Sequence, residues 1–245
     1  RETPTRAPSG HDPSAEPARL ALLGVAALLA AVINSVAGGG SLVSFPALLA
    51  MGVPPVLASA TNTAALTPGN LAAAIAYRSE FGRETRLLAA CAAVGGVVGA
   101  VVLVTAPPRA FELAVPWLVA GATLLLVFDI GARRPSRVGI ALVSVYGGYF
   151  GAGIGMLVLA LLGKGDLHAK NAAKCVIVAS VNGAATGYFL LTGRVQLVAA
   201  LVMAGGAILG GYGGAAVAKR VSAKRVRWVV VAIGVLVLRR SQPEL

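Results

Sequence analysis

The run Val36-Ala-Gly-Gly-Gly-Ser41 interrupts one long apolar stretch, and Phe150-Gly-Ala-Gly-Ile-Gly155 interrupts another about 114 positions later. Glycine adopts positive φ and tolerates close approach, so a glycine cluster inside an apolar segment predicts a break in a helix. The interrupted segments, 20–51 and 138–163, therefore each predict two arms joined at a glycine tip. The arm 41–51 is about 16 Å of helix and cannot cross a hydrocarbon core of about 30 Å alone.

Each break is followed by the same succession of residues, which indicates an internal repeat. Asn62 and Asn70 follow the first break, and Lys174 and Asn182 follow the second, each pair eight residues apart. Eight residues are two helical turns, so each pair shares one helix face. A two-fold repeat of about 110 residues, with interrupted apolar segments at matching positions, is typical of the binding site of a secondary transporter.

The composition is that of a membrane protein. Of the 245 residues, 57% are hydrophobic and 12% are charged, the mean hydropathy is +0.82, and the 31 glycines suit closely packed membrane helices. The net charge of +12 comes from short basic clusters between apolar runs, which we interpret as topology determinants rather than a nucleic-acid-binding surface. Cys91 and Cys175 lie inside apolar runs without metal-ligand spacing, so we expect no metal site and no cofactor.

We expect one integral membrane domain with a disordered N-terminal tail. Residues 1–19 are rich in proline and charge, which predicts disorder. Residues 20–129 form the first predicted transmembrane repeat and residues 138–240 the second. A signal peptide is the alternative for the N-terminal segment, but the glycine motif recurs at 151, where no signal peptide lies. Full-length apolar runs are predicted at 55–77, 87–105, 113–129, 171–191, 195–218 and 226–238.

The positions of Lys and Arg favour re-entrant hairpins over full crossings. Short cytoplasmic loops carry an excess of Lys and Arg. If each interrupted segment leaves on the side it entered, one face receives thirteen basic residues and the loops of the other hold only Arg109 and Arg194. If both interrupted segments instead cross the membrane fully, the basic residues divide almost equally between the two faces. The sequence therefore predicts an all-α polytopic membrane protein with two inverted repeats, each a Gly-broken re-entrant hairpin plus three transmembrane helices. The thirteen are Arg78, Arg83, Arg86, Arg133, Arg134, Arg137, Lys164, Lys170, Lys219, Arg220, Lys224, Arg225 and Arg227.

The two hairpin tips supply the first candidate substrate-binding residues. A tip within the bilayer leaves backbone N–H and C=O groups that lipid cannot satisfy, so it must face protein or a polar cavity. The arms after the tips aim helix N-termini at the centre, which favours an anion. Alternatively, the glycines only allow packing or kinking. The candidates are Gly38, Gly39, Gly40, Ser41, Gly151, Gly153 and Gly155.

Lys174 is the only basic residue placed inside an apolar segment rather than at its edge. A charge at the centre of a membrane helix costs about 2.5 to 3.5 kcal/mol on insertion scales, so it predicts substrate binding. Snorkelling to the cytoplasmic surface is the alternative. Asn62, Asn70 and Asn182 are either substrate ligands or interhelical hydrogen-bonding residues. No Asp or Glu lies deep in an apolar run, which disfavours a carboxylate proton relay, although backbone carbonyls at a hairpin remain able to hold Na⁺.

The chain resembles the TauE/SafE family of sulfite and organosulfur-anion exporters from about residue 24 to residue 238. The resemblance rests on AGGGSLVSFPALLAMGVPP, ATNTAALTPGN and AYR in the first half, and on FGAGIG, KNAAKCVIVASVNGAATGYF, GRV, GGYGGA and RVRW in the second. It implies a polytopic bacterial inner-membrane protein that moves small anions. Separately, His168 has only Asp166 nearby and the sequence shows no hydrolytic arrangement, so we expect no enzyme activity. At Lys174 the second half has Ala-Ala-Lys where Ala-Thr-Asn stands at 60–62.

These patterns predict a secondary transporter that exports small anions by alternating access, with substrate bound between the two hairpin tips. The expected partners are the lipid bilayer and a small anionic substrate of the sulfite or organosulfonate class. An anion channel of the same architecture and a membrane scaffold or sensor without transport are the alternatives. The sequence predicts no oligomeric state.

Overall fold

The computed structural model describes residues 16–36, 38–76, 82–127, 137–162 and 167–218. Every regular element in these ranges is an α-helix, which confirms the predicted all-α class. The expected apolar run 226–238 lies outside the described residues. The helices are α1 (Glu16–Val36), α2 (Ser41–Ala50), α3 (Pro55–Ala76), α4 (Arg83–Thr105), α5 (Pro108–Val127), α6 (Arg137–Tyr149), α7 (Ile154–Leu161), α8 (Leu167–Leu191) and α9 (Leu197–Ala218).

Several of these helices are built to cross a membrane. Large apolar side chains on their outer surfaces are exposed, among them Leu22, Val94 and Leu209, and Trp117 on α5. An apolar outer surface of this kind marks contact with lipid or protein rather than water. The chain is therefore a multi-pass membrane protein. The four segments long and apolar enough to span are Glu16–Ser35, Arg83–Thr105, Ala169–Leu191 and Leu197–Gly214.

Helix α1 begins earlier than the sequence predicted. We expected the disordered tail to extend to residue 19, but residues 16–19 form the first turn of α1. Pro17 is tolerated there because the first N–H groups of a helix have no intrahelical partner, and the acidic Glu16 favours the positive end of the helix dipole. The tail prediction is therefore wrong for these four residues, and residues 1–15 lie outside the described ranges.

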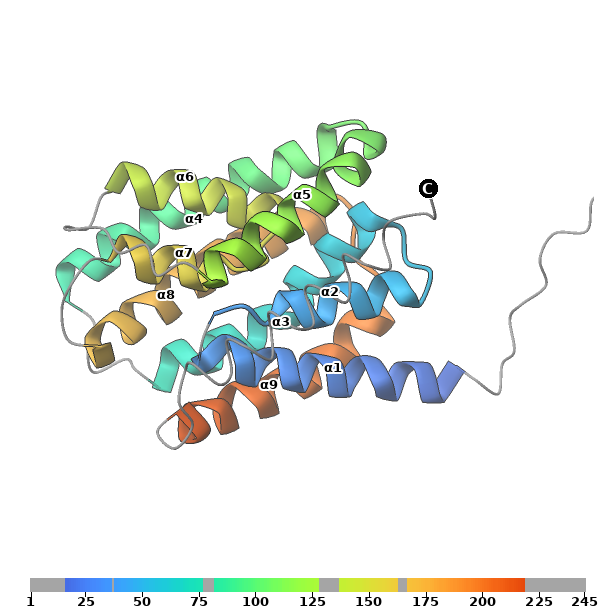
Figure 1. Ribbon diagram of the computed structural model, residues 1–245, viewed down its shortest axis with the longest axis horizontal. Helices are drawn as coiled ribbons and strands as arrows, with labels where there is room; N and C mark the ends of the chain where they lie inside the picture. Colours follow the sequence, from blue (N-terminus) through green and yellow to red (C-terminus); the bar gives the residue numbers. More distant parts are fainter. Residues whose placement is uncertain (1–15, 37, 77–81, 128–136, 163–166, 219–245) are drawn as a thin grey trace, which may run out of the picture.

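The chain reverses direction at both glycine breaks (Figure 1). Helix α2 runs back along α1, and α7 turns back along α6. The starts of α4, α6 and α8 consequently lie at one end of the bundle, on the left of Figure 1, and the starts of α1, α3, α5 and α9 lie at the other. The first turns at the left end carry Arg83, Arg137 and Lys170, whereas Arg109 lies in the first turn of α5 at the right end.

The two halves of the chain pack in an equivalent pattern. Helix α1 packs on α9, and α6, its counterpart at the second break, packs on α4. Helix α3 contacts α9 as α8 contacts α4, and α3 and α8 also contact each other. These pairings are therefore unchanged when α1, α3 and α4 are exchanged for α6, α8 and α9, as expected for a duplicated sequence.

Glycines four residues apart allow the closest of these contacts. On α9, a Cβ atom at Gly206 or Gly210 would collide with the backbone of α1, at the carbonyl oxygens of Gly24 and Leu28 respectively. Gly99 of α4 meets the backbone of α6 in the same way. Small residues at this spacing let helix backbones approach closely in membranes. Much of the high glycine content thus serves helix packing outside the two breaks.

Candidate functional site

The first break is a tight backbone turn between α1 and α2. Gly38 has φ +87°, and its N–H donates to the carbonyl oxygen of Ile33 at 3.2 Å. Side chains rarely tolerate positive φ, so this turn requires glycine. Gly39 and Gly40 are buried like Gly38, and Ser41, which begins α2, is half-buried. The three glycines of the first tip therefore lie inside the protein.

The second break begins with the same turn and then differs, because Gly153 has φ +76° where the corresponding Gly40 has φ −58°. Gly151 has φ +75°, and its N–H donates to the carbonyl oxygen of Tyr146 at 3.3 Å. The Tyr146 hydroxyl in turn donates to the carbonyl oxygen of Ala152 at 2.7 Å, which ties the tip to α6. Gly153 immediately precedes α7 and, like Gly151, is buried. The second tip is therefore also enclosed by protein.

The two breaks touch each other. A Cβ atom on Gly38 would lie 2.7 Å from the carbonyl carbon of Gly155, and one on Gly155 would lie 2.8 Å from Gly38 Cα. Phe45 of α2 and Phe150 at the second break also pack edge to face, with ring centroids 5.3 Å apart. The structure thus brings residues from both predicted tips into backbone contact.

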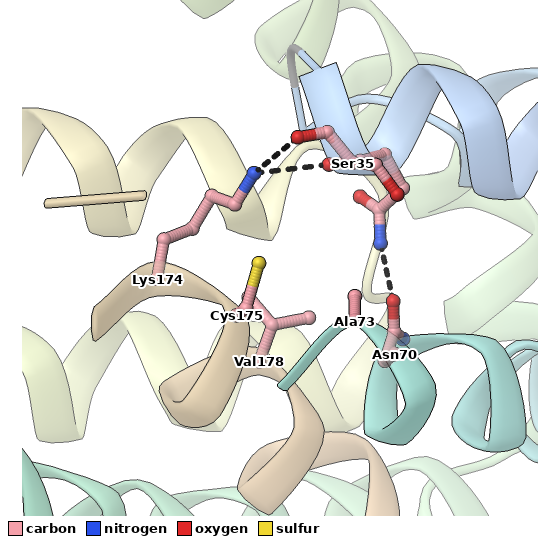
Figure 2. Close-up of a pocket in the computed structure, with 7 residues that line it drawn as sticks. Ser35, Asn70, Ala73, Lys174, Cys175 and Val178 are labelled. Carbon is pink, nitrogen blue, oxygen red and sulfur yellow. Dashed lines mark hydrogen bonds between the residues drawn. The ribbon is translucent and has the colours of Figure 1, made fainter. Parts of the chain in front are cut away.

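Lys174 of α8 is enclosed, with 2% of its surface exposed. Its Nζ donates to the carbonyl oxygens of Asn34 at 3.1 Å and Ser35 at 3.2 Å, in the last turn of α1 (Figure 2). Carbonyls at this end of a helix have no intrahelical donor and carry the negative end of the dipole, so the ammonium stabilises them. The side chain does not extend to the surface, and the snorkelling alternative is wrong for this structure.

A small cavity of about 10 Å³ lies beside Lys174, between α1, α3 and α8. Across it, Asn34 Nδ2 donates to Asn70 Oδ1 at 2.6 Å (Figure 2). The volume holds about one water molecule. Two predicted binding residues, Asn70 and Lys174, therefore line one cavity. Its full lining is Asn34, Ser35, Asn70, Ala73, Lys174, Cys175 and Val178.

This cavity has unused hydrogen-bond donors. An ammonium carries three N–H groups, and acceptors in the described residues take two from Lys174. The Asn70 Nδ2 group is buried and has no partner in the described part of the chain. No Asp or Glu is among the lining residues. Free donors around a buried positive charge fit an anion, which supplies acceptors and the missing negative charge.

Asn62 and Asn182 do not line this cavity. Each is buried, and each side-chain oxygen lacks a hydrogen-bond partner within the described ranges. Asn62 belongs to the segment of α3 beside the second break, because Ser59, one turn earlier, donates from Oγ to the carbonyl oxygen of Tyr149 at 3.5 Å. The structure therefore places Asn70 and Lys174 at the first break and Asn62 at the second.

The sequence analysis missed Asn34 and Ser35. The available signal was a pair of polar residues near the end of an otherwise apolar arm, separated from the first glycine by two residues. The Ser35 hydroxyl donates back to the carbonyl oxygen of Ala31 at 2.9 Å, so Ser35 contributes its backbone carbonyl to the site. Every residue type has a backbone carbonyl, so this contribution could not be recognised from the residue type.

A larger cavity of about 560 Å³ lies at the end of the bundle where α3 and α5 begin and α8 ends. Arg194 and Glu112 are its charged lining residues. Lys174 lies about two turns from the opposite end of α8. Close to the larger cavity, the N–H of Gln196 donates to Thr61 Oγ1 at 3.0 Å, which joins the α8–α9 turn to α3. The remaining lining residues are Pro54, Pro55, Val56, Leu57, Pro108, Thr192 and Gly193.

Comparison with known proteins places similar sequences among membrane transporters. The family model described as sulfite exporter TauE/SafE matches residues 23–240. The probable membrane transporter protein ORF9 of Sinorhizobium sp is 31% identical over 234 residues, which cover 88% of this chain and 89% of that protein. The probable membrane transporter protein YfcA of Escherichia coli is 29% identical over 239 residues, covering 89% of this chain and 87% of that protein. No solved structure gives a significant match.

Proposed function

This chain belongs to the sulfite exporter TauE/SafE family and is a membrane transporter of that type, and we propose that it exports small anions of the sulfite or organosulfonate class. The proposed mechanism is secondary transport by alternating access, and the proposed location is the bacterial inner membrane. The sequence predicted a substrate between the two glycine breaks, and we propose its position at the first break, beside Lys174 and Asn70.

The observation that carries this proposal is the excess of donors beside Lys174. Its ammonium is buried without an acidic residue in the cavity lining, and Asn70 Nδ2 has no partner among the described residues. Hydrogen bonds from charged donors to an oxyanion are short and strong. A sulfite or sulfonate group offers three oxygens, so it matches the Lys174 and Asn70 donors better than a cation or a neutral molecule.

The proposed membrane topology follows from the chain reversals. We assign α1–α2 and α6–α7 as re-entrant hairpins, residues 20–129 and 138–240 as inverted repeats, and the basic left end of Figure 1 as cytoplasmic. The short arms α2, with 10 residues, and α7, with 8, are too short to span a membrane. Their glycine tips stay within protein, where non-helical backbone is tolerated at membrane depth.

Alternating access is supported by the two unequal cavities. The cavity at Lys174 holds about one water molecule, so an anion of four or more heavy atoms enters only when the helices around it move apart. The cavity of about 560 Å³ at the other end of the bundle is large enough for such an anion. We propose that the structure represents a state closed around the site and open toward the end with few basic residues.

Export is the favoured direction for energetic reasons. With a negative cell interior, each exported negative charge gains about 2.3 kcal/mol per 100 mV. An anion therefore leaves down the membrane potential without needing a proton relay.

The test is flux of radiolabelled sulfite, sulfoacetate and sulfate in proteoliposomes with an imposed membrane potential. Lys174→Met removes the charge, and we expect it to reduce flux by roughly ten- to a hundredfold, the effect of losing a charge-assisted hydrogen bond. Lys170→Met is the matched control, because Lys170 lies one turn earlier on α8 and does not line the cavity. It should transport normally.

The outcomes separate the candidate functions. Saturable flux with counterflow supports a carrier, whereas flux without saturation or counterflow supports a channel. If no tested anion moves in the wild type, the export proposal is wrong for these substrates. If Lys174→Met transports as well as Lys170→Met, the anion does not bind at Lys174.

A further inference from the structure

Helices α1 and α6 end in equivalent backbone hydrogen bonds at the two glycine breaks. At the first, Gly38 N–H donates to the carbonyl oxygen of Ile33; at the second, Gly151 N–H donates to that of Tyr146. The bonds are 3.2 and 3.3 Å long, and each donor follows its acceptor by five residues. Residues 33–38 of the first turn therefore correspond one to one with residues 146–151 of the second. The carbonyl groups of residues 34 and 35 are thus equivalent to those of residues 147 and 148.

The equivalent carbonyl groups have different partners. At the first break, the carbonyl oxygens of Asn34 and Ser35 both accept from Lys174 Nζ. Their counterparts at the second break belong to Gly147 and Gly148, which are buried at the C-terminal end of α6. No donor to these two oxygens is found among the described residues. The negative end of the α6 dipole thus lacks the positive charge that α1 has.

In the repeat, Asn62 occupies the position that corresponds to Lys174. Asn62 is 2% exposed, and its Oδ1 has no hydrogen-bond partner in the described part of the chain. Residues on either side of Asn62 along α3 reach the second break: Ser59 Oγ donates to the carbonyl oxygen of Tyr149 at 3.5 Å, and a Cβ atom on Gly151 would lie 3.7 Å from Thr63 Oγ1. Asn62, whose side-chain oxygen has no partner in the described ranges, therefore belongs to the segment of α3 that contacts the second break.

The two halves thus have opposite requirements. The first has unused donors around a fixed ammonium, and the second has unused acceptors. Asn182, the repeat counterpart of Asn70, adds another buried side-chain oxygen without a partner in the described ranges. Buried acceptors without donors are costly, and a bound cation satisfies several of them together.

We propose that a monovalent cation of the Na⁺ class binds at the C-terminal end of α6, held by Asn62 Oδ1 and the carbonyl oxygens of Gly147 and Gly148. It occupies the place that the Lys174 ammonium takes in the first half. Carbonyl groups at the ends of broken membrane helices are known types of ligand for Na⁺. The neutral oxygen ligands favour a single charge, because Ca²⁺ and Mg²⁺ sites generally include carboxylates. The inference rests on the proposed transport function, in which this cation is the coupling ion.

The test measures cation binding without transport. The thermal midpoint of the full chain in detergent is followed while NaCl replaces choline chloride at constant ionic strength. A ligand that binds only the folded state raises the midpoint in proportion to the logarithm of its concentration above the Kd. We expect a rise of about 2–4 °C when the Na⁺ concentration is about five times the Kd. Equal midpoints in NaCl and choline chloride for the wild type overturn the proposal.

Two substitutions at Asn62 and one control locate the effect. Asn62→Ala should lose the response to Na⁺. Asn62→Lys supplies a permanent ammonium, as Lys174 does, and should be insensitive to Na⁺ while remaining at least as stable as the wild type without it. Leu71→Ala, on the same helix but with its side chain 53% exposed, should keep the wild-type response. If Asn62→Lys responds to Na⁺ as the wild type does, the cation binds elsewhere and the proposal is wrong.

This experiment fails separately from the test of export. A protein that exports anions but is insensitive to Na⁺ retains its proposed function and loses only the cation site. A protein that is stabilised by Na⁺ through Asn62 but moves no tested anion retains the site and loses the export assignment.

Discussion

Gly38 and Gly155 lie backbone against backbone, because a Cβ atom added to Gly38 would be 2.7 Å from the carbonyl carbon of Gly155. This contact joins the turn between α1 and α2 to the start of α7, from the other half of the chain. Movement of either glycine break must therefore change its contact with the other. In the alternating-access mechanism that we propose, this contact would couple the two halves.

Gly38→Ala should destabilise the protein and abolish transport. The left-handed conformation costs a side chain about 1 to 2 kcal/mol, and overpacking adds about 1 to 3 kcal/mol. Gly52→Ala is the matched control, since Gly52 has φ +80° but nothing within 4 Å of an added Cβ. Thermal unfolding in detergent and anion flux measure both variants. Equal losses in the two would mean that the contact with Gly155 contributes nothing beyond backbone conformation.

Gly206→Leu should separate α9 from α1 and reduce folded yield, because a side chain at this position meets the backbone of Gly24. A clash with backbone is not relieved by a rotamer change, so we expect at least about 1 to 3 kcal/mol of destabilisation. Gly205→Leu is the control, because nothing lies within 4 Å of its added Cβ. Size-exclusion profiles and thermal midpoints should differ between the two variants. Similar behaviour would contradict the close α1–α9 packing.

Tyr146→Phe should loosen the second break while leaving the fold intact. The variant loses the 2.7 Å hydrogen bond from the hydroxyl to the Ala152 carbonyl, worth about 1 kcal/mol. We expect a slightly lower thermal midpoint and faster hydrogen exchange of the backbone at residues 150–153. Tyr212→Phe is the control, since Tyr212 is 67% exposed. Unchanged exchange in Tyr146→Phe would show that the tip is held by other contacts.

Arg194→Gln should slow anion transfer from the end of the bundle that holds the larger cavity. A positive charge in the cavity lining raises the local anion concentration, and added salt screens this effect. Anion uptake is measured in proteoliposomes in which the end with the larger cavity faces the medium. The uptake rate of the variant should be below that of the wild type at low ionic strength and equal to it at high ionic strength. Arg109→Gln, at the same end but outside the cavity lining, is the control. A loss independent of salt would argue against electrostatic attraction.

The sequence predicted the positions of both breaks because a glycine cluster inside an apolar run interrupts the helix at that point. The turns at Gly38 and Gly151 require positive φ, and the residues after them begin new helices. The apolar runs predicted α3, α4, α8 and α9 within a few residues. The tail boundary was wrong at Glu16 because proline and charge suit a helix's first turn as well as a disordered segment.

The candidate site was only partly predictable. Helical periodicity placed Asn62 with Asn70, and Lys174 with Asn182, on shared faces, but the structure separates the members of the first pair. Asn70 bonds Asn34 at the first break, and Asn62 lies beside the second. Residues two turns apart on a long helix are about 12 Å apart along its axis, so one face can serve two sites.

By itself, the sequence determined that this is an all-helical membrane protein with two glycine breaks in repeated segments, because hydrophobicity and glycine conformation act locally along the chain. Only the tertiary structure decided that Lys174 bonds the last carbonyl groups of α1 and that Gly38 touches Gly155. The physical reason is that periodicity specifies which residues share a helix face. The helix that this face meets is decided by packing between distant segments.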